Sequence, residues 1–310
     1  MKLVLITGVA GNIGSALAHA LLKNGNYKIV GVDNLSTGAR HKLPSPTDKF
    51  SFIKSDVNDY REISAIFHSN HFDYVFHFAA VVGVQRTLAN PLLVLNDING
   101  IKNILSLSKN SFVTKVFYSS SSEVYGEPVS LPQHEETTPL NSRLPYAIVK
   151  NLGEAYFRSY YEEHGLPYTV FRFFNTYGPN QSDDFVVPRF IHTALKNDQI
   201  SIYGDGSQTR TFCYVDDNIE AIVRCLDQGC YVNDVVNIGS DIEYKIVDLA
   251  NLILQISGSK STIVHFPPLP EGDMTRRQPD ISKMKVLLNR NLTPLNKGIK
   301  LLIDHYTSKG

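Results

Sequence analysis

Tyr146 and Lys150 carry the clearest chemistry in the sequence. They stand in Tyr146-Ala-Ile-Val-Lys150, and a spacing of four places both side chains on one face of a helix. A nearby ammonium favours the phenolate, so we expect Tyr146 to act as a base near neutral pH, although its free pKa is about 10. Ser121, in a run of four serines, would orient a substrate hydroxyl toward Tyr146. Such a pair also arises by chance on surface helices.

A glycine-rich turn near the start of the chain predicts a phosphate-binding site. The turn Gly8-Val-Ala-Gly11-Asn12-Ile13-Gly14 follows an apolar run, Lys2–Thr7, and precedes apolar residues at helical spacing, Ser15–Leu22. Glycines let the chain turn sharply and approach a pyrophosphate, whose charge is met by the N–H groups at the helix start. Glycines alone are a weak signal, but their place between a strand and a helix strengthens it.

Asp33 ends the next apolar run, Lys28–Val32. In a dinucleotide-binding fold, an acid at this place accepts hydrogen bonds from the ribose hydroxyls and repels a 2′-phosphate, so it favours NAD over NADP. Arg40 could soften that preference. The alternative is that Asp33 only caps a turn with Asn34 and Ser36.

Hydrophobic periodicity predicts alternating strands and helices up to Asn175. The expected strands lie at 2–7, 28–32, 50–54, 74–79, 115–118 and 168–174, and the expected helices at 15–22, 59–68, 91–109 and 146–164. His77 lies within a continuous apolar strand, and we interpret it as a core histidine. The serine run follows the strand at 115–118, at the end of a strand where α/β folds place their ligands.

This pattern is typical of an α/β fold with a Rossmann-type, doubly wound parallel sheet and a smaller C-terminal α/β substrate lobe. The alternation loosens after Asn175, where we expect a strand at 212–215 and a helix capped by Asp216. The expected boundaries are 1–174 and 205–240 for the NAD-binding sheet domain, and 175–204 and 241–310 for the lobe. The ligand cleft would lie between them.

Composition excludes several classes of function. The 310 residues include 30 basic and 30 acidic side chains, so the overall charge favours neither nucleic acid nor an anionic membrane. The three cysteines (Cys213, Cys225 and Cys230) lack zinc-site spacing, so no metal site is expected. Their sparse number fits a reducing compartment. No apolar run reaches transmembrane length, and we expect a cytoplasmic protein.

In combination, these motifs resemble the extended short-chain dehydrogenase/reductase family, and within it the NAD-dependent nucleotide-sugar epimerases and dehydratases. The serine run leads into Val124-Tyr125-Gly126, and Arg172-Phe-Phe-Asn-Thr-Tyr-Gly-Pro179 follows further on. Two C-terminal stretches, 203–217 and 272–281, look most like UDP-glucuronate decarboxylases and their close epimerase relatives. The similarity covers essentially the whole chain.

The resemblance implies roles for individual residues. Gly8, Gly11 and Gly14 would cradle the NAD pyrophosphate, with Asn12 and Ile13 donating backbone N–H groups. Asp33 and Asn34 would hold the adenosine ribose, Asp56 and Val57 would contact adenine, Ala79 and Ala80 would line the cofactor, and Lys150 would bond the nicotinamide ribose. Ser121, Ser122, Glu123, Tyr146 and Lys150 would form the catalytic set.

The substrate would be a nucleotide sugar. The resemblance assigns Asn175 and Arg210 to its diphosphate, Val187 and Tyr203 to its base, Arg276 or Arg277 to a second positive contact, and Gln85 and Arg86 to further substrate contacts. An arginine fork suits a diphosphate. The alternative is that Arg210 and Arg276 are surface residues paired with Asp205 or Asp273.

The family's shared first step is oxidation of the sugar C4 hydroxyl to a ketone. Dehydratases usually show Asp-Glu before Val-Tyr-Gly, whereas this chain shows Ser122-Glu123, so dehydration is disfavoured. Decarboxylases share Ser-Glu, but the segment Ala79–Arg86 does not resemble theirs. Simple epimerases usually lack the glutamate, which could also pair with a nearby cation. We choose 4-epimerisation narrowly, with UDP-glucuronate decarboxylation as the alternative and net 4-dehydrogenation as a third outcome.

A non-catalytic NAD sensor on the same fold is an alternative of a different class, but such proteins commonly lose the tyrosine or the lysine. The helices at 91–109 and 146–164 carry apolar residues on more than one face. They could pair across a two-fold axis as a four-helix bundle, so we expect a homodimer.

Overall fold

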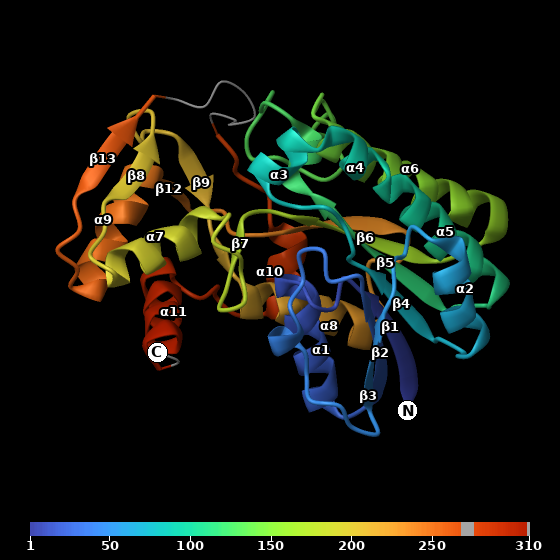
Figure 1. Ribbon diagram of the computed structural model, residues 1–310. Coiled ribbons are helices and arrows are strands. Elements are labelled where there is room, and N and C mark those ends of the chain that lie inside the picture. Colours follow the sequence, from blue (N-terminus) through green and yellow to red (C-terminus); the bar gives the residue numbers. More distant parts are fainter. Residues whose placement is uncertain (268–275, 309–310) are drawn as a thin grey trace.

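Figure 1 shows the computed structural model of the protein, which describes residues 1–267 and 276–308. Seven parallel strands form one sheet in the order β11-β6-β5-β4-β1-β2-β3. The chain builds outward from β1 to β3 and then returns to the other side at β4, so the carboxyl ends of β1 and β4 border a topological switch point. The strands are β1 (Lys2–Thr7), β2 (Tyr27–Asp33), β3 (Phe50–Lys54), β4 (Tyr74–His77), β5 (Lys115–Ser121), β6 (Tyr168–Phe173) and β11 (Asp234–Ile238).

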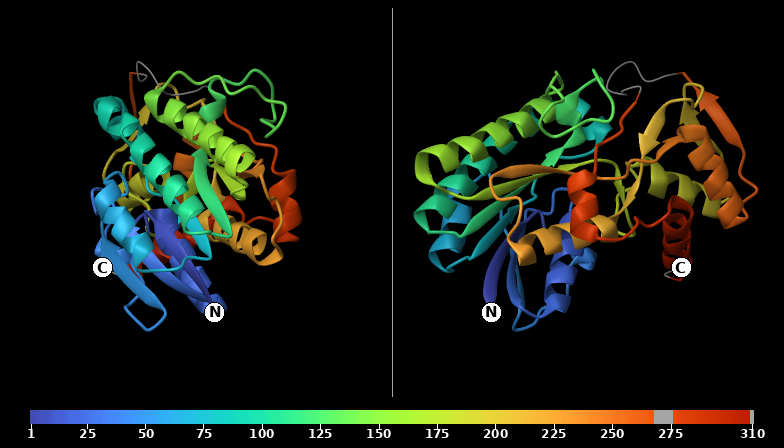
Figure 2. Two further views of the ribbon diagram at one scale, coloured as in Figure 1. Left: turned by 90° about the vertical axis from the view of Figure 1, so that its right-hand side faces the viewer. Right: turned by 180° about the vertical axis from the view of Figure 1, so that it is seen from behind.

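Helices cover both faces of the sheet (Figure 2). One face packs against α1 (Asn12–Asn24), α8 (Val215–Gln228) and α10 (Ser282–Leu288). The other packs against α2 (Tyr60–His68), α5 (Asp97–Asn110) and α6 (Pro145–His164). Because both faces are covered, the inner strands are mostly apolar on both faces rather than alternating. The predicted Rossmann-type sheet is therefore confirmed.

A smaller lobe packs around its own apolar core, at the left of Figure 1. Its helices are α7 (Val186–Leu195), α9 (Ile246–Ser257) and α11 (Leu295–Ser308). Pairs of short strands complete it: β8 (Ile200–Tyr203) with β13 (Ile263–Phe266), β9 (Thr209–Thr211) with β12 (Glu243–Lys245), and β7 (Thr176–Tyr177) with β10 (Cys213–Tyr214). Met284 and Leu288 of α10 pack in the core of the sheet domain instead. Although α10 falls within the range 241–310 that we propose for the lobe, it therefore packs with the sheet domain.

Several predicted elements differ in detail. The helix expected at 91–109 is two helices, α4 (Pro91–Leu95) and α5. They meet at a tight turn where the Asn99 N–H donates to the Asn96 carbonyl. The strand at 212–215 is shorter, and Asp216 lies in the first turn of α8, whose N-cap is Tyr214. An acid is favourable in that turn because it meets the positive end of the helix dipole.

The remaining short elements are α3 (Val84–Ala89) and two 3₁₀ turns, Arg40–Lys42 and Ser122–Tyr125. The second turn begins at Ser122, directly after the last residue of β5. Ser119–Ser121 therefore belong to the strand rather than follow it. Across residues 1–267 and 276–308, no helix has the length and apolarity needed to span a bilayer.

Candidate active site

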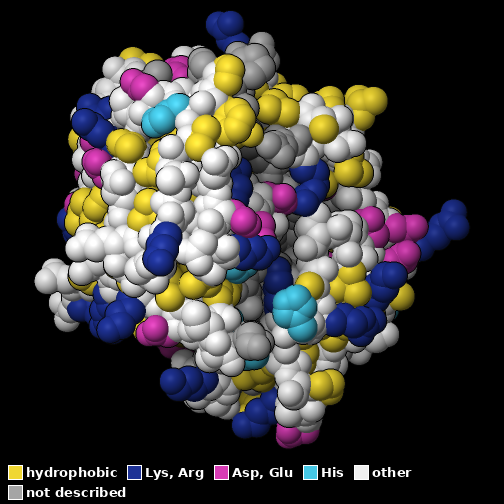
Figure 3. All heavy atoms as spheres, turned by 60° about the vertical axis from the view of Figure 1, so that its left-hand side comes forward, with side chains coloured by type: hydrophobic (Ala, Val, Ile, Leu, Met, Phe, Trp, Pro, Cys, Tyr) yellow, Lys and Arg dark blue, Asp and Glu magenta, His cyan; other side chains and the backbone are white. Residues whose placement is uncertain are grey.

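A cavity of ≈ 580 Å³ lies between the sheet domain and the lobe. Figure 3 views the molecule from the lobe side, where the surface is hollowed and basic and acidic side chains meet. The structure brings together nearly all of the predicted site residues at this cavity. They are Gly8, Gly11, Asn12, Ile13, Gly14, Asp33, Asn34, Asp56, Val57, Ala79, Ala80, Arg86, Ser121, Ser122, Glu123, Tyr146, Lys150, Asn175, Val187, Tyr203, Arg210 and Arg277.

Two predicted residues stand apart from this set. Arg276 does not line the cavity; its side chain is 50% exposed and forms an ion pair with Glu243 at 2.6 Å. Gln85 falls within α3, but its side chain lies outside the described part of the chain. Arg86 reaches the cavity from α3 and pairs with Asp184 of the lobe at 2.8 Å.

The glycine turn brings backbone to the floor of the cavity. Gly8 has a φ of +72°, which only glycine adopts readily, and α1 begins at Asn12 with no side-chain cap on its first N–H groups. A Cβ on Gly14 would lie 2.2 Å from the Gly8 carbonyl oxygen. The turn is therefore closed by backbone packing, and its uncapped N–H groups suit an anionic group.

Gly14→Ala is expected to remove most of the co-purifying dinucleotide and to lower stability by about 1–3 kcal/mol, because the new Cβ collides with the Gly8 carbonyl. Dinucleotide released by denaturation and urea unfolding are the measurements. Gly25→Ala, at the other end of α1, is the control: its φ of +84° strains the backbone, yet no atom lies within 4 Å. It should lose stability and keep the dinucleotide. Full occupancy in Gly14→Ala would contradict this role.

Asp33 faces the same part of the cavity from the end of β2. Its carboxylate accepts hydrogen bonds from the N–H groups of Ala10, at 3.0 Å, and Leu35, at 2.8 Å. Asn34 accepts the N–H of Ser36 and donates to Asp56 at 3.2 Å. Asp33 thus holds the loops on either side of it while presenting its carboxylate to the cavity.

Ser121, Tyr146 and Lys150 meet at the end of β5 and the start of α6. Pro145 is in the first turn of α6, where its fixed φ favours the helix start, and Tyr146 follows it. Tyr146 shares a hydrogen bond with Ser121. The Lys150 ammonium lies 5.7 Å from the centre of the Tyr146 ring and donates to the Ser119 carbonyl at 2.6 Å.

The net pKa of Tyr146 is raised in this arrangement, whereas the spacing from Lys150 alone predicts a lowered value. Burial raises the pKa of Tyr146, and Glu123 and Asp97 raise it further, while the Ser121 hydrogen bond and the Arg277 charge lower it. Burial also lowers the pKa of Lys150 to about 8. The spacing placed both groups correctly, but it could not report how far the site is desolvated.

Glu123 and Arg277 form an ion pair of 2.9 Å in the cavity wall, with side chains 14% and 7% exposed. The structure therefore selects Arg277 over Arg276 as the cavity arginine. It also pairs Glu123 with a cation, which is the second role that the sequence allowed for this glutamate. Arg210 is buried and lines the cavity, so the surface alternative is wrong for Arg210. For Arg276 the surface placement is right, with Glu243 as the partner; Asp273 lies outside the described residues.

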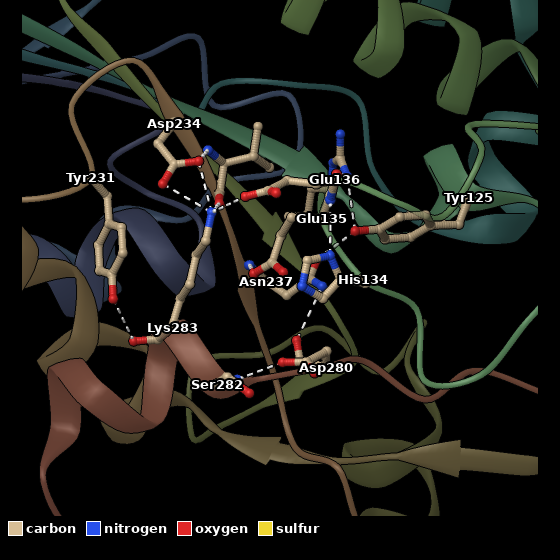
Figure 4. A network of polar contacts seen from close by, with 12 residues as sticks. Tyr125, His134, Glu135, Glu136, Tyr231, Asp234, Asn237, Asp280, Ser282 and Lys283 are labelled. Carbon is tan, nitrogen blue, oxygen red and sulfur yellow. Dashed lines mark hydrogen bonds and ion pairs between the residues drawn. The ribbon is translucent and has the colours of Figure 1, made fainter.

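A polar network fixes the segment that carries Arg277. The backbone N–H of Asn237 in β11 donates to Glu135 at 2.8 Å, and its side chain donates to the Asp280 carbonyl at 3.1 Å. Figure 4 shows Tyr125 and Asn237 pointing toward one another, with the Tyr125 hydroxyl donating at 2.8 Å. Since Tyr125 follows Glu123 closely and Asp280 follows Arg277, this network holds both sides of the ion pair.

A buried ion pair anchors α6 to the sheet. Arg172 of β6 donates to Glu154 at 2.9 and 2.7 Å, and both side chains are almost fully buried. Ser120, beside Ser121 in β5, also donates to Glu154. Glu154 lies one turn beyond Lys150, so the pair fixes the helix that carries Tyr146 and Lys150. Sequence analysis missed Glu154, because a glutamate within an amphipathic helix looks like a surface residue.

Comparison with known proteins agrees with this geometry. The NAD-dependent epimerase/dehydratase family matches residues 4–239. The chain is 38% identical to a UDP-N-acetyl-alpha-D-glucosaminuronate decarboxylase of Bacillus cytotoxicus, over 92% of this chain and 91% of that protein. It is 34% identical to UDP-glucuronic acid decarboxylase 1 of Xenopus tropicalis, over 98% and 72%. The structure superposes on the UDP-glucose 4-epimerase of Thermotoga maritima, solved with UDP-glucose, with a TM-score of 0.93 at 31% identity and 99% coverage of both chains.

The matched residues include the glycine turn, Asp33, the serine run and the Tyr146/Lys150 pair. The cavity presents these residues together. The chain therefore belongs to the NAD-dependent epimerase/dehydratase family and is an NAD-dependent enzyme that acts on nucleotide sugars.

Proposed function

We propose that the protein oxidises the C4 hydroxyl of a UDP-sugar and then returns hydride to the other face of the ketone, giving the 4-epimer. The observation that carries this proposal is the meeting of Ser121, Tyr146 and Lys150 at one end of the cavity. NAD supplies the hydride acceptor when it is bound. Ser121 would hold the C4 hydroxyl, Tyr146 would take its proton, and Lys150 would supply the nearby positive charge.

The two halves of the cavity suit a cofactor and a substrate that face each other. On the sheet side, we assign the pyrophosphate to the glycine turn, the adenosine ribose to Asp33 and Asn34, and adenine to Asp56 and Val57. On the lobe side, we assign the substrate diphosphate to Asn175 and Arg210, and its base to Val187 and Tyr203. Because the chain is an enzyme, the alternative of a non-catalytic NAD sensor, which the sequence left open, is excluded.

A panel of substrates tests the proposal. The purified protein is incubated with UDP-glucose, UDP-galactose, UDP-glucuronate and UDP-N-acetylglucosaminuronate, and the products are read by NMR. Inversion at C4 supports epimerisation, and accumulation of a 4-ketone with reduced cofactor supports net dehydrogenation. Turnover of none of the four would contradict the UDP-sugar assignment.

The Glu123–Arg277 pair favours a second candidate, decarboxylation of a UDP-uronate. A 4-keto uronic acid is a β-keto acid and can lose carbon dioxide. Arg277 is a buried guanidinium in the cavity wall, and such a group suits a carboxylate at C6. The relatives from Bacillus cytotoxicus and Xenopus tropicalis bear decarboxylase names. Release of carbon dioxide with formation of a UDP-pentose would establish this candidate over epimerisation.

Under the second candidate, Arg277→Met is expected to lower kcat/KM for UDP-glucuronate by about 10-fold to 100-fold, the value of one charge-assisted hydrogen bond. Neutral UDP-hexoses should lose less, because they carry no C6 carboxylate. Arg276→Met is the matched control, since the neighbouring arginine lies outside the cavity. Equal losses for acidic and neutral sugars would argue against recognition of a carboxylate by Arg277.

We also propose a homodimer that pairs α4, α5 and α6 across a two-fold axis as a helical bundle. Leu92 of α4 is 80% exposed, and Leu93, Ile148 and Leu152 are exposed as well. Apolar side chains on packed neighbouring helices support an interface with a second copy. Sedimentation at micromolar concentration tests it, and a monomer would contradict it.

Cys213, Cys225 and Cys230 are free thiols, which supports a location in the reducing cytoplasm.

A further inference from the structure

Asp97 lines the same cavity as Tyr146 and Lys150, although no motif singled it out. It stands in the first turn of α5. Its Oδ2 accepts a hydrogen bond from the Val81 N–H at 2.8 Å, and the Asn58 side chain provides another hydrogen bond. The Asn58 amide oxygen in turn accepts the Gly100 N–H at 2.9 Å. The carboxylate is therefore held in place by its own helix and by two loops.

A small cavity of ≈ 10 Å³ adjoins both Asp97 and Lys150. Both residues line it, together with His77, Tyr118 and Tyr146. The Tyr118 hydroxyl is buried and has no hydrogen-bond partner among the described residues. Such a space is about the smallest that holds one water, and its polar groups share the lining with Ala79, Ala80, Ile101 and Val149. Asp97 of α5 and Lys150 of α6 thus border one small space, which Tyr146 also lines.

Lys150 needs a counter-charge there, since its side chain is buried. Its Nζ donates a hydrogen bond to the carbonyl of Ser119 at 2.6 Å. This bond satisfies one N–H group of the ammonium, but a neutral carbonyl does not balance the full positive charge. Two carboxylates oppose the effect of burial, Asp97 first and Glu154 second. Glu154 is already neutralised by the two hydrogen bonds from Arg172. No ion pair of Asp97 occurs within the ranges 1–267 and 276–308, and its charge raises the pKa of Lys150.

We propose that Asp97 is a positioning residue that keeps the buried ammonium of Lys150 charged beside Tyr146. The inference rests on the proposed roles of Tyr146 and Lys150 in C4 oxidation. Other groups around Lys150 cannot replace Asp97. Burial and the Lys150 charge lower the pKa of His77 to about 3, and burial raises the pKa of Tyr118, so both stay neutral. Glu123, which faces Tyr146 from the other side, is paired with Arg277.

Asp97→Asn is the decisive variant because it retains the size and shape of the side chain and removes its charge. Asp97 raises the pKa of both Lys150 and Tyr146. Its loss should therefore lower both, and the alkaline and acidic limbs of the kcat profile should move together to lower pH, by about one pH unit. A purely structural defect would lower kcat at every pH and leave the limbs in place.

A direct titration separates this inference from the proposed function. Lysine ε-carbon NMR follows Lys150 in the purified protein with its bound cofactor, and Lys150→Met assigns the signal. The midpoint should fall in Asp97→Asn and stay near the native value in Asp97→Glu. Asp97→Ser is a second neutral variant if Asp97→Asn folds poorly. Asp73→Asn is the matched control, since Asp73 also accepts a backbone N–H but pairs with Lys2 far from the cavity.

An unchanged Lys150 midpoint in both neutral variants would overturn the role of Asp97, whatever the activity. A lowered midpoint in a protein that turns over none of the UDP-sugars would contradict the proposed function and leave the role of Asp97 standing. A lowered midpoint with a shifted kcat profile would support both.

Discussion

Replacing Tyr146 by phenylalanine is expected to reduce kcat by about 10²-fold to 10⁴-fold, the usual contribution of a positioned general base. Only the phenolic oxygen is lost, and this oxygen shares a hydrogen bond with Ser121 inside the cavity. The ring would keep its packing beside Lys150. KM should therefore change little, since the substrate diphosphate and base are assigned to the lobe. Steady-state kinetics on whichever UDP-sugar the panel identifies is the measurement.

Tyr160→Phe is the matched control for this prediction. Tyr160 lies on the same helix and loses the same oxygen, but it is not part of the cavity lining. It should retain kcat within a small factor. If Tyr146→Phe were as active as Tyr160→Phe, a different group would have to accept the proton. Thermal unfolding of both variants shows whether any loss of activity reflects loss of fold.

Burial disfavours the charged forms of both Tyr146 and Lys150. Burial raises the pKa of Tyr146 and lowers that of Lys150 to about 8. The phenolate and the ammonium are therefore disfavoured together in this pocket. A group that carries positive charge beside Tyr146 during the reaction would favour the phenolate.

Replacing Arg172 by methionine is expected to lower the free energy of unfolding by about 3–5 kcal/mol, because it leaves the Glu154 carboxylate buried without its partner. Arg172 and Glu154 are 3% and 2% exposed, and two hydrogen bonds of 2.9 and 2.7 Å join them. Urea unfolding gives the measurement. The double variant Arg172→Met/Glu154→Leu should recover part of the loss, because no charge is then left unpaired.

Arg276→Met provides a control of matched geometry. Arg276 also forms two hydrogen bonds with one carboxylate, Glu243, at 2.7 and 2.6 Å, but it is half exposed. An exposed pair of this kind contributes little to stability, because solvent screens it. The comparison therefore isolates burial from geometry. Similar losses in Arg172→Met and Arg276→Met would show that the orphaned carboxylate is relieved by solvent, and would contradict the anchoring role of the buried pair.

The sequence by itself determined the frame of the site. The glycine turn, the acid after β2 and the Tyr146/Lys150 spacing are local patterns, and each depends on a few neighbouring residues. Strand ends in a doubly wound sheet meet at one edge, so the order of the elements already brings these groups together. The parallel sheet and the cofactor half of the cavity could be predicted for that reason.

Only the tertiary structure decided the electrostatics and the choice among neighbours. Arg276 and Arg277 are adjacent in sequence, yet one reaches Glu243 and the other reaches Glu123 inside the cavity. Asp97 looks like a favourable first-turn residue until the fold turns it toward Lys150. A pKa depends on burial and on charges from distant segments. No spacing within one helix could have shown that the pocket raises the pKa of Tyr146 rather than lowering it.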